Sequence, residues 1–303
     1  LTAIFTIVIG SLQAAIIYVD QDATGANNGT SWANAYNEIY DAIFNHADGD
    51  VIWVAEGTYV ITNLSKETPH EINDELTILG GFNGTESNST ARNWDENVTI
   101  ITGERGLTTS QYDNQLYFFR LQNLSDQASL KINGCILEQI GNDDNPGIYF
   151  QSNGSSFQNQ NPSELILRNT IIRNGYGQIY YAPSGSETTM TFENTLIRDH
   201  DNDGVLFEFR GTESTNRLVN CTIAQCTQNY GDGFYSLSGA SNTIEIHNSI
   251  VWANSFTPAW GASAAPNDNE IVTHTISEDV CEDCGLPAYS NLISSNPKFV
   301  NVA

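Results

Sequence analysis

Leu165-Ile-Leu167-Arg-Asn169-Thr-Ile-Ile172 contains the pattern that decides the fold: two apolar residues at alternate positions, then Asn, a small residue and an aliphatic one. Close copies are Met190-Thr-Phe192-Glu-Asn194-Thr-Leu-Ile197 and Ile244-Glu-Ile246-His-Asn248-Ser-Ile-Val251. Looser copies are Arg217-Leu218-Val-Asn220-Cys-Thr-Ile223 and Leu130-Lys-Ile132-Asn-Gly134-Cys-Ile-Leu137, where Gly replaces Asn. The Asn or Gly positions lie 35, 25, 26 and 28 residues apart. A repeat of this size predicts a coiled array of strands.

Each repeat is predicted to hold about three short strands. Besides the pattern above, an apolar run precedes the next copy, in segments 147–150, 178–181, 204–207 and 233–236. Alternation sends every second side chain to the same face of a strand, which we expect to be the interior. Asn suits the tight bend after the first strand because it tolerates left-handed backbone. We expect these side chains to hydrogen-bond along the stack.

The segment before the repeats predicts a helical cap. Ile16–Val19 forms a short strand, and residues 32–47 show helical spacing with Ser31 as a plausible N-cap. We expect this amphipathic helix to cover the interior and strand edges that the first coil would otherwise expose.

Leu1–Ala15 is an uncharged apolar run that ends in small residues. It resembles the h-region and cleavage end of a secretory signal peptide, and it is too short for a spanning helix. The alternative is a buried first strand. We expect secretion, a chain truncated at its start, and one domain over residues 16–303.

The net charge of −25 arises from 36 acidic and 11 basic residues. Such a surface repels nucleic acid, anionic membranes and, unless cations intervene, anionic polysaccharides. Of the five Cys, Cys135 and Cys221 take the small position after the bend and are expected in the core. Cys281 and Cys284 are spaced to close a small loop.

The chain resembles secreted right-handed parallel β-helix proteins of the pectin-lyase-like superfamily, of the kind found in Bacteroidetes-type bacteria. The resemblance rests on the sequence at 16–36, DGDVIWVAEGTY (48–59), LTILGGFNGTE (76–86), ARNW (91–94), the Asn-Thr/Ser repeats and the tail at 291–303. It implies an all-β right-handed parallel β-helix that continues past residue 303. The fold alone does not set the function, because β-helices include lyases, hydrolases and adhesins.

The resemblance also implies where chemistry would lie. Pectate lyases of this superfamily use calcium-binding Asp residues and an Arg or Lys that removes a proton next to a uronate carboxylate. Arg173 and Arg198 each lie four residues after their Asn, so we expect them on neighbouring coils. They are the candidate catalytic residues, and a surface Arg ladder is the alternative.

The segment from Asp199 to Gly204 has an Asp at every second position, at Asp199, Asp201 and Asp203, as calcium-binding loops do. The twelfth position is Arg210 rather than Glu, which excludes an EF-hand. We therefore expect a looser calcium site here, or else a solvated acidic turn.

Tyr149, Tyr180 and Tyr235 occupy one position in the second strand of their repeats. If they point outward, they form an aromatic ladder with a step of about 4.8 Å that suits sugar stacking. The sequence thus favours a secreted or surface-displayed monomer for adhesion or glycan binding. A calcium-dependent polysaccharide lyase acting on uronate-containing glycans is the alternative, and the sequence leaves open whether the protein is an enzyme.

Overall fold

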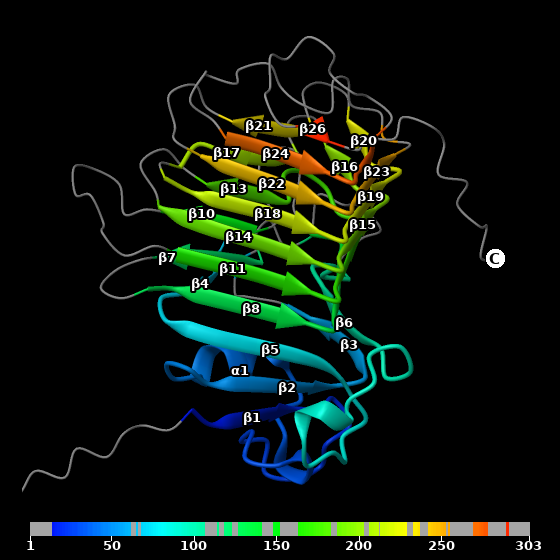
Figure 1. The fold of residues 1–303 in the computed structure, drawn as a ribbon. Helices are drawn as coiled ribbons and strands as arrows, with labels where there is room; N and C mark the ends of the chain where they lie inside the picture. The colour runs from blue at the N-terminus through cyan, green and yellow to red at the C-terminus, as the bar shows by residue number, and fades with distance from the viewer. Residues whose placement is uncertain are drawn as a thin grey trace, which may run out of the picture.

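The strands of this chain assemble into three parallel sheets that form the sides of one coil (Figure 1). The computed structural model describes residues 14–61, 65, 68–106, 114, 118–122, 127–140, 148–151, 163–182, 187–202, 206–211, 213–228, 233–236, 242–252, 254, 269–277 and 289–290. Among these residues no helix is both long and apolar enough to cross a membrane.

The largest sheet, sheet A, has ten strands and faces the viewer in Figure 1. Its strands, in spatial order, are β1 (Ile16–Val19), β2 (Val51–Ala55), β5 (Glu75–Phe82), β8 (Ser129–Asn133), β11 (Ser163–Arg168), β14 (Thr188–Glu193), β18 (Thr215–Val219), β22 (Thr243–His247), β24 (Asn269–Thr273) and β26 (Tyr289–Ser290).

Sheets B and C form the other two sides. Sheet B contains β3 (Gly57–Val60), β6 (Thr99–Thr102), β9 (Ile136–Glu138), β12 (Ile171–Arg173), β15 (Leu196–Arg198), β19 (Thr222–Ala224), β23 (Ile250–Trp252) and β25 (Ile276–Ser277). Sheet C contains β4 (His70–Ile72), β7 (Phe119–Gln122), β10 (Ile148–Gln151), β13 (Tyr180–Ala182), β17 (Phe207–Phe209) and β21 (Phe234–Ser236). A short pair, β16 (Asp201–Asn202) and β20 (Thr227–Gln228), lies between them in sequence.

The chain visits sheets A, B and C in turn and then returns to sheet A one strand further along. Figure 1 shows sheet A running to the right, sheet C running back behind it, and the coils rising from blue to red. This course is right-handed. It confirms the all-β right-handed parallel β-helix with three short strands per coil.

The predicted helix over residues 32–47 is wrong in length but right in place. The chain forms a 3-10 turn at Trp32–Asn34 and an α-helix, α1, only at Ile39–Asn45. Helix α1 follows β1 where later coils have strands of sheets B and C, and it buries Ile39, Ala42 and Ile43 against the first strands. Trp32 instead packs on Tyr18 and Phe82, beside the outer face of sheet A.

The bend between sheets A and B depends on one left-handed residue per coil. The φ angles are 48° at Asn169, 51° at Asn194, 55° at Asn220 and 49° at Asn248. Asn is among the few residues with a side chain that enter this region at low cost. The Asn in each repeat is therefore required by the backbone of the bend.

The Asn side chains also hydrogen-bond to one another from coil to coil. The Nδ2 of Asn169 donates to Oδ1 of Asn133 at 3.0 Å, that of Asn194 to Asn169 at 3.3 Å, and that of Asn220 to Asn194 at 3.2 Å. The predicted side-chain stack is thus confirmed for these coils. We call this row the amide ladder.

Gly134 takes the bend position in the coil where the repeat departs from Asn. Its φ is 76°, and a Cβ at this position would lie 3.0 Å from Nη1 of Arg92. The guanidinium of Arg92 fills that space and donates to the carbonyls of Gly80 and Asn133 at 3.1 and 3.0 Å. Glycine is present because another segment packs against this bend.

The small residue after each bend points into the coil. These residues form a column along the coil and are almost fully buried: Cys135, Thr170, Thr195, Cys221, Ser249 and Thr275. The hydroxyls of Thr170 and Ser249 each donate at 2.8 Å to the carbonyl oxygen two residues earlier, which closes the bend. The predicted core position of Cys135 and Cys221 is confirmed, and both are free thiols. Cys281 and Cys284 lie outside the described residues.

The interior is filled by columns of apolar side chains with a few polar exceptions. One column contains Leu130, Leu165, Met190 and Ile244, but Asn216 takes the same place in β18. Asn216 is fully buried, and neither amide atom has a hydrogen-bond partner. Such an unpaired group costs about 1–3 kcal/mol, so apolar burial in the surrounding coils must offset it.

His200 is a second polar residue of the interior. It is 1% exposed, its Nε2 donates to the carbonyl of Gly177 at 2.9 Å, and its Nδ1 has no partner. A Cβ on Gly175 would lie only 2.4 Å from the imidazole, so glycine is needed above the ring. Burial lowers the pKa of His200 to about 4, because protonation would add an unpaired N–H inside the coil.

Replacing Asn194 tests the bend and the amide ladder separately. Asn194→Ala should lower the free energy of unfolding by about 2–4 kcal/mol, since it loses two ladder bonds and places a Cβ residue at positive φ. Asn194→Gly should lower it by about half as much, because glycine adopts the positive φ without a steric penalty and loses only the two ladder bonds. Denaturant titration followed by circular dichroism measures both values. Equal losses in the two variants would contradict the backbone requirement.

His200 makes stability depend on pH. Its pKa is about 4 in the folded chain and 6.5 ordinarily, so between these values the unfolded chain binds a proton that the folded chain does not. Stability is therefore complete above pH 6.5 and decreases as the pH falls toward 4. In His200→Gln the melting temperature should decrease less between pH 6.5 and 4. Part of the decrease remains because the variant retains His70, whose pKa is also lowered by burial to about 4. An unchanged pH dependence would show that His200 does not contribute.

Candidate functional site

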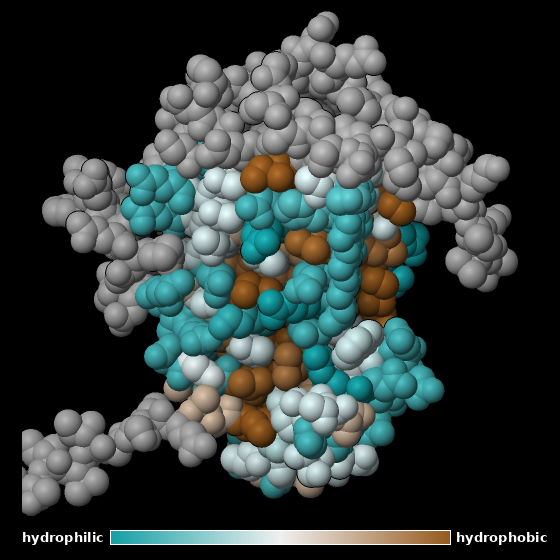
Figure 2. Space-filling model, in the orientation of Figure 1, coloured by the Kyte–Doolittle hydropathy of each residue, from teal (hydrophilic) through white to brown (hydrophobic). Residues whose placement is uncertain are grey.

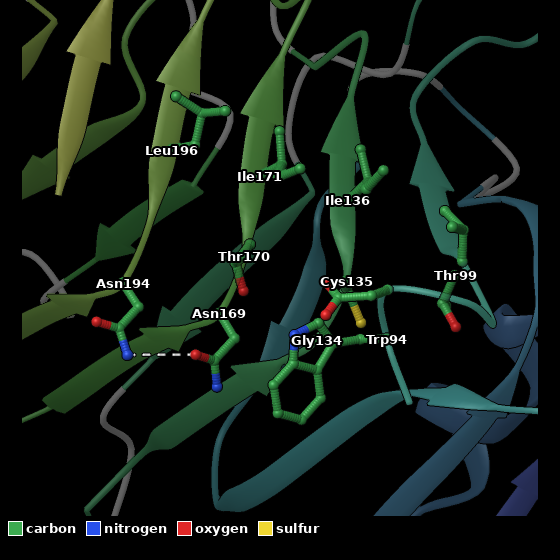
Figure 3. A pocket seen from close by; sticks show the side chains of 12 residues that line it. Trp94, Thr99, Gly134, Cys135, Ile136, Asn169, Thr170, Ile171, Asn194 and Leu196 are labelled. Atoms are coloured by element: carbon green, nitrogen blue, oxygen red, sulfur yellow. Dashed lines mark hydrogen bonds between the residues drawn. The ribbon is translucent and has the colours of Figure 1, made fainter. Parts of the chain in front are cut away.

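A hollow of about 380 Å³ lies outside sheet B, between the bends and the excursion at residues 83–97. Trp94 forms one side, and the bend residues Asn169 and Asn194 form another (Figure 3). We call this hollow the Trp94 groove. Figure 3 shows its wall as a row of aliphatic side chains, one from each of three successive strands: Ile136, Ile171 and Leu196.

The excursion is fixed to the coil by close backbone contacts. Gly81 has φ 90°, and a Cβ on it would lie 2.8 Å from the backbone nitrogen of Trp94. The N–H of Asn93 donates to the carbonyl of Gly81 at 2.7 Å. The guanidinium carbon of Arg92 lies 5.0 Å from the centre of the Trp94 ring. Trp94 is therefore held in place, yet its side chain remains 38% exposed.

The other two sides of the groove differ in chemistry. Ile136, Ile171 and Leu196 are half-buried outward-facing residues of strands whose central residue points into the core. The amide ladder lies along their edge, and Figure 2 shows a hydrophilic column along the edge of sheet A beside a hydrophobic strip. Asn169 and Asn194, which line the groove, each commit one N–H and one oxygen lone pair to the ladder and keep one of each for other partners.

Cys135 also lines the groove but is not a nucleophile. Burial raises the pKa of its thiol to about 12, so the thiol stays protonated at neutral pH. The groove therefore offers an indole face, aliphatic surface and neutral amides.

The predicted calcium loop borders a second hollow, of about 410 Å³. Asp199 and Asp201 both line it, as do Asn114 and Gln225. Burial, and then the charge of Asp199, raise the pKa of Asp201. Asn114 is 4% exposed, and its Oδ1 has no hydrogen-bond partner. This set of oxygen donors is of the kind that calcium prefers.

The third carboxylate of the predicted calcium loop, Asp203, lies outside the described residues. Within the described part of the chain, no three His, Cys, Asp or Glu side chains gather as a metal site. Asp199 is paired with Arg198, and Asp201 accepts a hydrogen bond from the hydroxyl of Thr227. The calcium site remains a prediction.

Arg173 and Arg198 lie on neighbouring strands in register, as predicted. Arg173 pairs with Glu138 at 2.8 Å, where both side chains are largely covered, and Arg198 pairs with Asp199. Each guanidinium is thus held by a carboxylate. Their position fits the surface Arg ladder, and their catalytic role stays untested.

The predicted ladder of Tyr149, Tyr180 and Tyr235 is wrong at Tyr180. Tyr180 is fully buried, and its hydroxyl donates to Oγ1 of Thr188 at 3.1 Å. The register pairs Tyr149 with Tyr181, so the apolar run at 178–181 is shifted by one residue relative to the run at 147–150. The side chains of Tyr149 and Tyr235 lie outside the described residues, so substrate binding there stays a prediction.

Sequence reasoning missed Trp94 as a site residue. Two signals pointed to it: the Gly at position 134, where other copies have Asn, and the paired Gly80 and Gly81. All three glycines are sites where residues 92–94 or a neighbouring bend approach the backbone closely.

Comparison with solved structures supports the fold through the match to a pectate lyase, which has a TM-score above 0.5. Pectate lyase Pel9A is 17% identical with a TM-score of 0.56, and the match covers 88% of this chain and 64% of that one. The PL6-family alginate lyase AlyGC is 13% identical with a TM-score of 0.49, covering 99% and 40%. A pectin methylesterase from Aspergillus niger is 14% identical with a TM-score of 0.45, covering 95% and 89%. The chain thus spans less than two thirds of the length of either lyase.

No curated protein matches the sequence. Residues 123–276 match the family described as "Right handed beta helix region". This segment contains the Asn bends and the strands between them. The chain therefore belongs to the right-handed β-helix family and has the pectin-lyase-like fold.

Proposed function

We propose that this protein is a non-catalytic extracellular β-helix that binds a neutral polysaccharide or cell-surface glycan in the Trp94 groove. The observation that carries this proposal is the exposed indole of Trp94, held by Arg92 beside the amide ladder. Indole faces pack on the C–H faces of sugar rings, while amides bond hydroxyl groups as donor and acceptor. The groove combines both.

The groove also has the period of a polymer. Its amides and aliphatic side chains come from successive coils, and strands in a sheet are about 4.8 Å apart. Equivalent groups therefore recur along the axis, which suits a chain of repeating units better than a single small molecule. The protein acts as a monomer that presents this face to an extended glycan.

Charge favours a neutral glycan. The net charge of −25 repels polyuronates, and Asp95 lines the groove. Secretion, expected from the apolar run at Leu1–Ala15, would bring the chain to extracellular glycans.

Loss of the indole should weaken binding. Trp94→Ala is expected to weaken binding of a neutral oligosaccharide about tenfold or more, because an aromatic anchor carries much of the energy at such sites. Calorimetry over a panel of cello-, xylo-, manno- and laminari-oligosaccharides measures the change. Trp252→Ala, which removes an outward Trp of sheet B that does not line the groove, should bind as the unchanged protein does. Equal affinity in Trp94→Ala would contradict the proposal.

A calcium-dependent polysaccharide lyase is the second candidate. It is favoured by the hollow where Asp199 and Asp201 meet the unpaired amide oxygen of Asn114. These oxygens would hold calcium, which would neutralise a uronate carboxylate. Arg198 would then be the group that takes the proton, because its partner Asp199 lines this hollow, whereas Glu138, the partner of Arg173, does not.

The lyase alternative has a direct assay. Polygalacturonate and alginate are incubated with the protein and calcium, and unsaturated products are followed by ultraviolet absorbance. Under the binding proposal the absorbance does not rise. A rise that disappears in Arg198→Ala and on removal of calcium would replace the binding proposal with the lyase.

A further inference from the structure

A third hollow, of about 470 Å³, lies at the N-terminal end of the coil between α1 and β4. Tyr40 and Phe44 of α1 line it on one side, and His70 and Asn73 line it on the other. We call it the α1 hollow. It shares no lining residue with the Trp94 groove or with the acidic hollow.

An aromatic pair provides a flat apolar surface here. Phe44 is 72% exposed, the highest value among the large hydrophobic side chains described as exposed. Its ring stacks on Tyr40 with centres 5.8 Å apart and planes 21° apart, and Tyr40 meets His70 edge-on at 5.4 Å. Phe44 and Tyr40 together form an aromatic patch on the lining of the hollow, and contiguous exposed apolar patches mark contact surfaces.

Two buried polar atoms in the same hollow have no partner. They are Nε2 of His70, a residue only 5% exposed, and Oδ1 of Asn73. Burial lowers the pKa of His70 to about 4, so its ring is neutral at physiological pH. A carbonyl oxygen accepts only, and a neutral imidazole keeps one accepting nitrogen. Oδ1 of Asn73 therefore needs a donor from a ligand, and Nε2 of His70 needs a donor or an acceptor according to its tautomer.

The charges around the hollow are already paired. Glu71 pairs with Arg120, and Asp74 pairs with His46 at 2.8 Å. A cationic ligand would find no unpaired carboxylate among these residues, and an anionic ligand would meet Glu71 in the lining of a chain with a net charge of −25. A purely apolar ligand would leave His70 and Asn73 unpaired. A neutral ring with hydroxyl groups satisfies all of these conditions.

We infer that the α1 hollow is a second binding site for a neutral sugar residue, separate from the Trp94 groove. The ring lies with its C–H face against Phe44, and its hydroxyl groups donate to Oδ1 of Asn73 and hydrogen-bond with Nε2 of His70.

Phe44→Ala tests this site with little risk to folding, because the side chain is exposed and alanine favours helix. Titration calorimetry with cellopentaose, xylopentaose, mannopentaose and laminaripentaose should give two sites for the unchanged protein. Phe44→Ala should keep only the Trp94 site, Trp94→Ala only the α1 site, and the double variant neither. Asn73→Ala should weaken the α1 site about tenfold.

The outcomes separate the two sites. An isotherm of Phe44→Ala identical to that of the unchanged protein overturns the α1 site and leaves the Trp94 groove untouched. An isotherm of Trp94→Ala identical to that of the unchanged protein overturns the groove alone. Absence of binding by every pentasaccharide overturns both. Tighter, Phe44-dependent binding of the glucosamine pentamer would overturn the assignment to a neutral ligand.

Discussion

The left-handed bend between sheets A and B is the constraint on which the rest of this structure depends. Each coil must turn sharply there, and Asn at positions 169, 194, 220 and 248 turns it at low conformational cost. The turn also sets the path of the chain beyond it, because the next residue enters the core and the one after it begins a strand of sheet B. Because the same turn recurs in register, the Asn side chains come within hydrogen-bond distance of one another.

The amide ladder links the fold to the proposed function. A residue chosen for its backbone conformation also places a neutral donor and acceptor at the surface of every coil. The excursion at residues 83–97 uses this surface: Arg92 binds the bend at Gly134, and Trp94 lies beside the next bend. The groove is therefore a modification of the repeat at its N-terminal end, where Gly80, Gly81 and Gly134 admit a second segment.

Much of the fold could be predicted because it is periodic. The Asn bends, the inward Cys135 and Cys221, and the register of Arg173 with Arg198 follow from residue spacing. Tyr180 could not be placed, because a strand shifted by one residue turns every side chain to the opposite face. The length of the helix at residues 32–47 was overestimated, because Trp32 has helical spacing but packs on sheet A. The Trp94 groove joins segments far apart in the chain, so the repeat spacing does not reveal it, and only Gly80, Gly81 and Gly134 mark where the segments meet.

The central claim is that the amide ladder and Trp94 act as one glycan-binding surface. Side-chain amide resonances of Asn169 and Asn194, together with the indole N–H of Trp94, test it most directly during a titration with the oligosaccharide that binds most tightly. We predict that all three signals shift together with one dissociation constant. Binding that leaves these three signals unchanged, or shifts only those of residues around Asp199 and Asp201, would contradict it.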